Sequence, residues 1–173
     1  MKRLIKTSGI LFIGLLCFSV APAQNVKTNK KAAKAEETAK IINSMNYIFK
    51  AAHVTPFTGA GKELTGEYDV TVAKDKIVVF LPYFGRAFSA PIDASEGGIK
   101  LTATHFDYKA TQSKKGGWDI VIKPKEKDLS GVKDVQLLRL SVSADGFASL
   151  QVMCLNRESI SFTGYIDEQK KEK

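Results

Sequence analysis

The chain has 173 residues, of which 44% are hydrophobic, and it carries a formal net charge of +8. This length suits a single domain with a sizeable core. The basic excess is scattered, with short runs at Lys30-Lys31 and Lys170-Lys171, whereas nucleic-acid-binding proteins concentrate theirs in a stripe. Nucleic acid is therefore not an expected partner, and weak attraction to an anionic lipid or polysaccharide stays open.

The first 23 residues are typical of a secretory signal peptide. Lys2, Arg3 and Lys6 form a positive n-region, residues 7–20 form an apolar run, and residues 21–23 (Ala-Pro-Ala) fit the small-x-small cleavage rule. We predict cleavage after residue 23 and a periplasmic or secreted protein. An uncleaved membrane anchor is the alternative, but the apolar run is shorter than the roughly 20 residues that a spanning helix needs.

The two cysteines lie on either side of this cleavage. Cys17 belongs to the apolar run and follows Leu16, where a lipoprotein signal requires a small residue, so a lipoprotein is the less favoured alternative. Cleavage leaves 150 residues with a net charge of +5 and Cys154 as the remaining cysteine. The domain must then fold without an internal disulfide. Cys154 alternates with Leu150 and Val152, which predicts a buried position.

After the signal peptide, the pattern predicts a flexible tether at residues 24–34 and a single helix-plus-β domain at 35–166. A charged tail at 167–173 follows. The helix is indicated by one apolar stripe at helical spacing. The stripe consists of Ile41, Ile42, Met45, Ile48, Phe49 and Ala52. Pro56 should end the helix, because its ring disfavours the helical conformation at Thr55. A stripe this wide is typical of a helix that packs on a sheet.

Beyond the helix the pattern changes to the period of β-strands. The apolar runs cover residues 68–72, 77–81, 99–108, 118–122, 138–142, 148–154 and 160–166. The run at 77–81 is apolar on both faces, which predicts a fully covered strand, and a bulge near Thr104-His105 would keep the third run on one face. Tight turns are expected at 73–75, 116–117, 143–146 and 156–157. The short connections favour antiparallel pairing.

The predicted fold class is therefore α+β and mainly β. An N-terminal helix should pack on a bent antiparallel sheet of about seven or eight strands. The sequence leaves a barrel-like closure and a sandwich open.

No catalytic, metal-binding or cofactor-binding motif is recognisable. His53 and His105 are the two histidines, and neither has a partner at a metal-ligand spacing. We therefore expect no metal, no cofactor and no enzymatic activity. A pair of carboxylates that meet in space could still hydrolyse a glycan. The candidates are Asp69, Asp93, Glu96, Asp107 and Asp119.

The segment LPYFGRAFSAP, residues 81–91, is the best candidate for a binding site. Pro82 should end the preceding strand, and Gly85 permits backbone angles that its aromatic neighbours resist. Both features predict a sharp change of chain direction. The aromatic side chains could then plug a corner of the core, or form a recognition patch. The candidate binding residues are Tyr83, Phe84, Arg86 and Phe88.

The chain also resembles a known family. The segments NYIFKAAHVTPFTGAGKELTGEYDVTV, VVFLPYFGRAFSAP, GGIKLTATHFDY and ADGFASLQVMCLNRESISFTGYI resemble secreted domains of unknown function that are abundant in anaerobic Gram-negative gut bacteria. The resemblance extends from about residue 46 to residue 166, and LPYFGRAFSAP is its most specific part. It implies an exported location and a compact helix-plus-β domain. It implies no activity, substrate, cofactor or catalytic residue.

The leading hypothesis from the sequence is a non-enzymatic binding or accessory domain of the cell envelope. One alternative is a hydrolase acting on envelope polymers or glycans. Another is a structural partner subunit of an envelope complex. The ligand or partner and the oligomeric state stay open.

Overall fold

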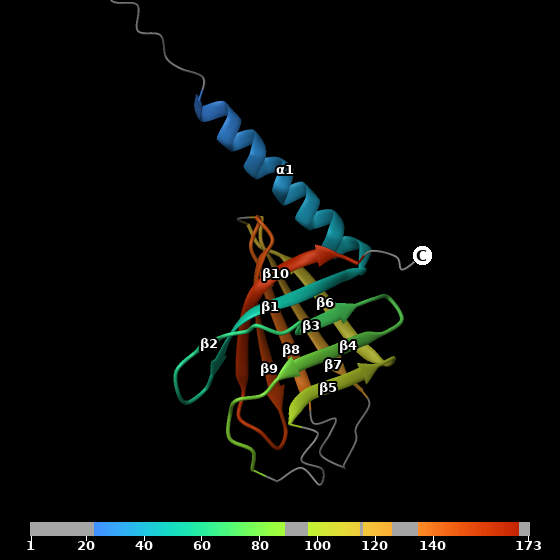
Figure 1. The fold of residues 1–173 in the computed structure, drawn as a ribbon. Helices are drawn as coiled ribbons and strands as arrows, with labels where there is room; N and C mark the ends of the chain where they lie inside the picture. The colour runs from blue at the N-terminus through green and yellow to red at the C-terminus, as the bar shows by residue number, and fades with distance from the viewer. Residues whose placement is uncertain (1–22, 89–96, 115, 126–134, 170–173) are drawn as a thin grey trace, which may run out of the picture.

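The computed structural model describes residues 23–88, 97–114, 116–125 and 135–169. Within these residues one helix, α1 (Ala23–Ser44), precedes ten strands (Figure 1). The strands are β1 (Tyr47–Pro56), β2 (Lys62–Glu63), β3 (Asp69–Val72), β4 (Ile77–Pro82), β5 (Gly98–Ala103), β6 (Phe106–Gln112), β7 (Trp118–Pro124), β8 (Val135–Val142), β9 (Phe147–Cys154) and β10 (Ile160–Glu168). The prediction of about seven or eight strands was therefore too low, mainly because β1 and the short β2 were not recognised.

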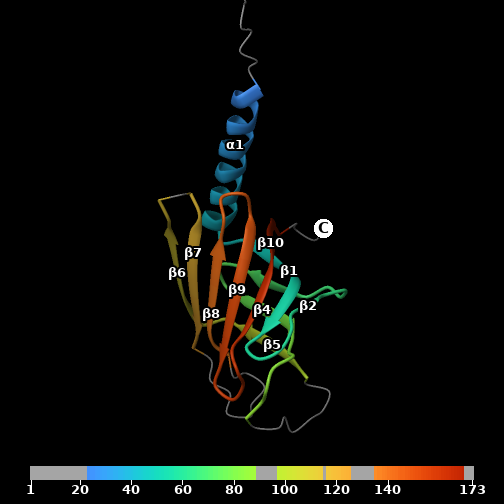
Figure 2. The same ribbon diagram turned by 90° about the vertical axis from the view of Figure 1, so that its left-hand side faces the viewer.

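The strands form one antiparallel sheet that is nearly closed into a barrel. Their order is β5-β4-β3-β1-β10-β9-β8-β7-β6, and β2 pairs with β1 beside this path. The sheet bends so strongly that β1, β3, β4 and β5 lie across β6, β7 and β8 (Figures 1 and 2). β5 and β6 are the first and last strands in this order, and they do not pair with each other in the described part of the chain. The mainly β, antiparallel fold class is confirmed.

The interior of this barrel is filled by side chains that alternate along each strand. Phe49 of β1, Leu138 of β8 and Phe162 of β10 are fully buried. The hydroxyl of Tyr47 on β1 lies 3.3 Å from the hydroxyl of Tyr108 on β6. Burial, followed by the neighbouring Tyr108, raises the pKa of Tyr47 well above its ordinary value. This tyrosine pair therefore links a central strand to the strand at one end of the sheet order.

Helix α1 stands on one end of the barrel and its N-terminal half points away from the strands (Figure 2). Ile42 is buried, and the hydroxyl of Thr38 donates a hydrogen bond to the carbonyl of Ala144 at 3.3 Å. α1 thus packs on the sheet through its C-terminal turns. Residues 24–34, which were predicted to form a flexible tether, lie within α1. No helix in the described residues is long and apolar enough to cross a membrane.

The helix also ends earlier than the sequence predicted. The Ser44 hydroxyl donates to the carbonyl of Ile41 at 2.7 Å, and Met45 takes a positive φ of 49°, which turns the chain into β1. Buried positions alternate along the first half of β1, and a bulge between Ala51 and His53 then shifts their parity. Ile48 and Ala52 lie on the outer face of β1, and their apolar side chains continued the helical spacing of Ile41 and Ile42. The helix predicted to continue to Pro56 was therefore wrong.

Most predicted connections are confirmed. Tight turns at 73–75, 116–117 and 143–146 join β3 to β4, β6 to β7 and β8 to β9, and 156–157 lies between β9 and β10. Thr104-His105 forms a turn between β5 and β6, however, and not a bulge within one strand. β4 is also not covered on both faces, because Phe80 is 45% exposed.

Candidate functional site

The segment that follows β4 docks against the connection between β9 and β10, at the end of the barrel away from α1 (Figure 1). β4 ends at Pro82, as predicted. The amide of Phe88 donates to the carbonyl of Asn156 at 2.8 Å, and the amide of Glu158 donates to the carbonyl of Arg86 at 3.0 Å. These backbone bonds fix the position of residues 86–88.

Tyr83 stabilises this docking from within. Its ring is partly buried against the core, and its hydroxyl lies 2.7 Å from the carbonyl of Arg86 and 3.1 Å from that of Glu158. The guanidinium of Arg157 lies 5.3 Å from the centre of the ring and also donates to the carbonyl of Gly98 at 2.8 Å. Burial, with smaller contributions from the neighbouring Cys154 and Glu158, raises the pKa of Tyr83 to about 12. We therefore assign Tyr83 a structural role.

Gly85 matters for the space it leaves rather than for its backbone angles. The glycines with positive φ in the described residues are Gly59, Gly116 and Gly146, so Gly85 does not need the conformation that only glycine adopts easily. A Cβ atom at Gly85 would lie 2.5 Å from the hydroxyl oxygen of Tyr83. The missing side chain therefore allows that hydroxyl to reach its carbonyl partners.

The other three candidate residues point outward. Phe84 is 43% exposed, Phe88 is 71% exposed, and Arg86 is exposed as well. The ammonium of Lys62 on β2 lies 5.0 Å from the centre of the Phe84 ring. The structure thus separates the predicted set into one structural tyrosine and three surface side chains.

Two further apolar side chains are exposed on segments that meet at this end. Phe57 precedes Thr58, whose hydroxyl donates to the Glu158 carboxylate at 3.1 Å, and Leu155 precedes Asn156. We call these exposed side chains the end patch. The end patch comprises Phe57, Phe84, Phe88 and Leu155. Sequence reasoning missed Phe57 and Leu155. Leu155 directly follows the predicted strand at 148–154, which was a usable signal, whereas Phe57 follows a segment that was predicted as helix.

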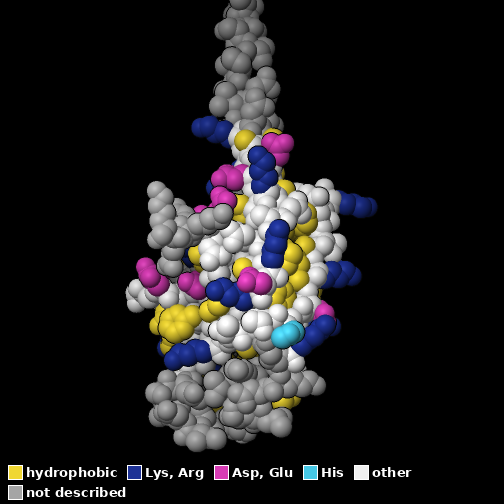
Figure 3. Space-filling model, turned by 90° about the vertical axis from the view of Figure 1, so that its right-hand side faces the viewer, with side chains coloured by type: hydrophobic (Ala, Val, Ile, Leu, Met, Phe, Trp, Pro, Cys, Tyr) yellow, Lys and Arg dark blue, Asp and Glu magenta, His cyan; other side chains and the backbone are white. Residues whose placement is uncertain are grey.

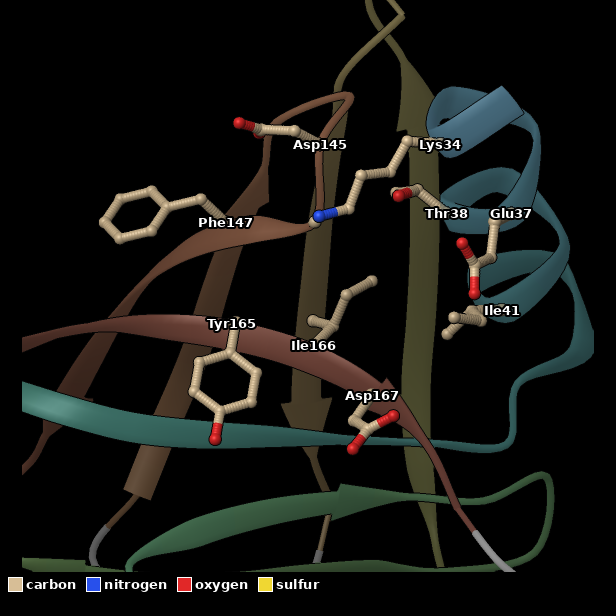
Figure 4. Close-up of a pocket in the computed structure, with 10 residues that line it drawn as sticks. Lys34, Glu37, Thr38, Ile41, Asp145, Phe147, Tyr165, Ile166 and Asp167 are labelled. Atoms are coloured by element: carbon tan, nitrogen blue, oxygen red, sulfur yellow. The ribbon is translucent and has the colours of Figure 1, made fainter. Parts of the chain in front are cut away.

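A second region lies at the opposite end, between α1 and the barrel. A hollow of about 390 Å³ separates them (Figure 4). Lys34 and Glu37 extend from the helix, whereas the rings of Phe147 and Tyr165 project from β9 and β10 (Figure 4). The Ser143 hydroxyl and, to a smaller extent, Lys34 lower the pKa of Asp145 in the adjoining turn. We call this the junction hollow.

Tyr165 also borders a second hollow of about 320 Å³, which is lined by β1 and by residues 66–69. Lys50 lines this hollow, and its ammonium lies 3.0 Å from the Asp167 carboxylate and 5.8 Å from the centre of the Tyr165 ring. Burial, followed by repulsion from Glu67, raises the pKa of Asp69. The junction hollow and this second hollow therefore share Tyr165 and meet at the Lys50–Asp167 pair.

The histidines and remaining carboxylates are dispersed. His53 Nδ1 lies 3.1 Å from Glu63 Oε1, and His105 Nδ1 lies 3.2 Å from the Thr104 hydroxyl. Among the carboxylates predicted for hydrolysis, Asp107 pairs with Lys125 at 2.7 Å and Asp119 accepts from the Ser141 hydroxyl at 2.7 Å. Asp93 and Glu96 lie outside the described residues. Among the residues that the structure describes, no group of three His, Cys, Asp or Glu could hold a metal ion.

Comparison with known protein families identifies a match over most of the chain. Residues 29–166 match the family described as Domain of unknown function (DUF4251). The chain belongs to this family. The match covers α1 from residue 29 and the strands up to residue 166 of β10. The predicted resemblance to a family of domains of unknown function is confirmed, while the name DUF4251 itself carries no activity.

A solved DUF4251 structure has a similar fold. It is the crystal structure of a DUF4251 family protein from Bacteroides eggerthii DSM 20697 at 1.95 Å resolution. The two chains superpose with a TM-score of 0.56 at 15% sequence identity, over 80% of this chain and 91% of that chain. A search of curated proteins found no match. At this identity the similarity concerns the fold alone.

Proposed function

We propose that this DUF4251 chain is an exported, non-enzymatic binding domain of the cell envelope that engages a partner protein through the end patch. The observation that supports this most strongly is the exposure of Phe57, Phe84, Phe88 and Leu155 at one end of the barrel. Exposed apolar clusters with a polar rim are characteristic of interaction surfaces. Arg86 and Lys62 supply cationic groups beside Phe84 and Phe88.

The backbone beneath the end patch supports the same proposal. Residues 86–88 are held by hydrogen bonds to residues 156 and 158, and Tyr83 is anchored below them. A surface that is already ordered loses little conformational entropy when a partner binds. The predicted signal peptide at residues 1–23 supports export, because its n-region, apolar run and cleavage site occur in the required order.

Crosslinking in intact cells tests this proposal. The wild-type chain should form a defined crosslinked product with a partner protein, identified by mass spectrometry. A variant with Phe84→Ser and Phe88→Ser should lose that product while keeping its circular dichroism spectrum, because both rings are exposed. Tyr165→Ala is the matched control, since it removes an exposed ring from another surface.

Two outcomes would contradict the proposal. One is a wild-type chain that yields no crosslinked partner. The other is a Phe84→Ser, Phe88→Ser variant that captures the same partner as the wild type. Tyr83→Ala is unsuitable as the test, because it removes packing and hydrogen bonds from the fold itself.

A hydrolase is the second candidate function, and one observation favours it. Glu67 and Asp69 line the same hollow, and the raised pKa of Asp69 is a property that a general acid needs. The test is to incubate the protein with neutral polysaccharides and separate the products by chromatography. Wild-type protein should release shorter oligosaccharides and Asp69→Asn should not. Product formation that is equal in both would remove Asp69 from any catalytic role.

A further inference from the structure

We propose that the outer face of the barrel around Tyr165 binds an uncharged, linear oligosaccharide. The site, which we call the Tyr165 groove, consists of the junction hollow and the second hollow that Tyr165 shares with it. It shares no residue with the end patch. The inference therefore adds a second ligand to the proposed function.

The strand register aligns the side chains of this groove. Residues that face one another across neighbouring strands project from the same face of the sheet. The aligned row is Phe147, Tyr165, Lys50, Asp69, Phe80 and Lys100, on β9, β10, β1, β3, β4 and β5. Neighbouring strands lie about 4.8 Å apart, so three strand steps separate Tyr165 from Phe80 by roughly 14 Å. A ligand that follows this row must be elongated and must run across the strands.

Aromatic rings border the row at both sides of the second hollow. Tyr165 is 49% exposed on one side, and Tyr68 lines the other. Tyr68 is held in place by stacking on Phe80, with 5.7 Å between the ring centres. A Cβ atom at Gly66 would lie 2.8 Å from the Tyr68 ring, so the glycine leaves room for this ring. The electron-rich faces of such rings attract the polarised C–H groups of a pyranose.

Between the rings lie both hydrogen-bond donors and acceptors. Lys50 supplies an ammonium group, and Glu67 and Asp69 supply carboxylates. A sugar hydroxyl both donates and accepts, so neighbouring hydroxyls can bind a carboxylate and an ammonium at once. An alternation of flat apolar surface and polar groups is what one face of a sugar chain requires.

The charges in the groove disfavour other ligands. Five carboxylates outnumber two ammonium groups along the two hollows, so an anionic polymer would be repelled. The carboxylates are those of Glu37, Glu67, Asp69, Asp145 and Asp167, and the ammonium groups are those of Lys34 and Lys50. A purely apolar ligand would strip water from these charged groups without replacing their hydrogen bonds.

The strands beneath the groove disfavour a peptide. An extended peptide binds most readily by adding to an unpaired strand edge. β1, at the centre of the row, is already paired on both sides, with β10 and with β3. An uncharged oligosaccharide fits the remaining chemistry best.

A tryptophan reporter tests the proposal directly. The chain has one tryptophan, Trp118, which is 9% exposed, so its fluorescence should respond little to a surface ligand. Tyr165→Trp keeps an aromatic platform and adds an exposed indole at the groove. We expect a saturable blue shift of its emission with at least one neutral hexasaccharide from a set of β-linked glucose, xylose and mannose, and none with polygalacturonate. A response only to polygalacturonate, or no response to any sugar, would overturn the proposal.

Calorimetric titration of variants with the same hexasaccharide then locates the site. Loss of one stacking ring in Tyr165→Ala should weaken binding about tenfold, and Glu67→Gln should weaken it severalfold. Phe88→Ala in the end patch is the matched control and should bind like the wild type. Unchanged affinity in Tyr165→Ala would overturn the assignment to the groove. If the wild-type chain binds the sugar but yields no crosslinked partner, the end-patch proposal fails and the groove proposal stands. If it yields the partner but binds no sugar, the groove proposal fails and the end-patch proposal stands.

Discussion

The two ends of the barrel are built in different ways. At the end patch, backbone hydrogen bonds between residues 86–88 and 156–158 and the anchored Tyr83 hold the surface. At the other end, α1 meets the strands through Ile42 and a hydrogen bond from Thr38 to Ala144, and a hollow remains beside them. The comparison shows how one sheet can present a fixed apolar surface at one end and an open, charged groove at the other. The four predictions below test this contrast.

Ile42→Ala should have the largest effect. Ile42 is 1% exposed, so truncation leaves a cavity where the helix meets the barrel. We expect the free energy of unfolding to fall by about 2–4 kcal/mol, measured by urea denaturation. Ile41→Ala is the matched control on the same helix and should cost less, because Ile41 is only partly buried. Equal losses would mean that the attachment of α1 does not depend on Ile42.

Gly85→Ala should disturb the opposite end. The new Cβ would displace the Tyr83 hydroxyl from its two carbonyl partners. We expect a loss of about 1–2 kcal/mol in the free energy of unfolding. Because both changes break the same contact, Gly85→Ala combined with Tyr83→Phe should cost less than the sum of the single variants. Strict additivity would show that Gly85 does not act through Tyr83.

Alkaline pH should weaken the contribution that Tyr83 makes to stability on the end-patch side. The pKa of Tyr83 is raised to about 12 in the folded protein, so folding favours its neutral form. This contribution is complete below the ordinary tyrosine pKa of about 10 and is lost as the pH rises from there towards 12. The melting temperature of the wild type should therefore fall more steeply over this range than that of Tyr83→Phe. Parallel curves would contradict the assignment.

Asp167→Asn should have the smallest effect on stability. The Lys50–Asp167 pair is 3.0 Å apart, but both side chains are almost half exposed. Removal should cost less than about 1 kcal/mol, and 0.5 M salt should narrow the difference from the wild type. If Asp167→Asn lowered the free energy of unfolding by more than Gly85→Ala does, the proposed contrast between the groove and the end-patch side would be wrong.

The sequence predicted the strands and turns well where local chemistry decides them. The two-residue alternation of β7–β9 and the glycine-containing turn at 143–146 were read correctly, because each depends on neighbouring residues. β1 was misread as helix because Ile48 and Ala52 on its outer face continued the helical spacing of Ile41 and Ile42. The pairing that makes this segment a strand is with β10, at the far end of the chain.

The candidate site was predicted only in part, for a similar reason. The segment around Tyr83 was identified, and its change of direction followed from Pro82. The partners Arg157 and Glu158 could not be found, since nothing local indicates that the β9–β10 connection lies beneath this segment. The Tyr165 groove also depends on register across six strands, which no single stretch of sequence reveals.

The pairing of β1 with β10 has a consequence for the time at which the domain can fold. Pairs such as Pro56 with Ile160 and Tyr47 with Glu168 lie more than a hundred residues apart in the chain. Contacts of such long sequence separation form slowly, and these cannot form until synthesis is nearly complete. A chain that emerges without its last strand lacks the partner for a central strand, so it should stay unfolded for longer. For a protein that we propose is exported, this delay would help to keep the chain in a state that can be threaded across a membrane.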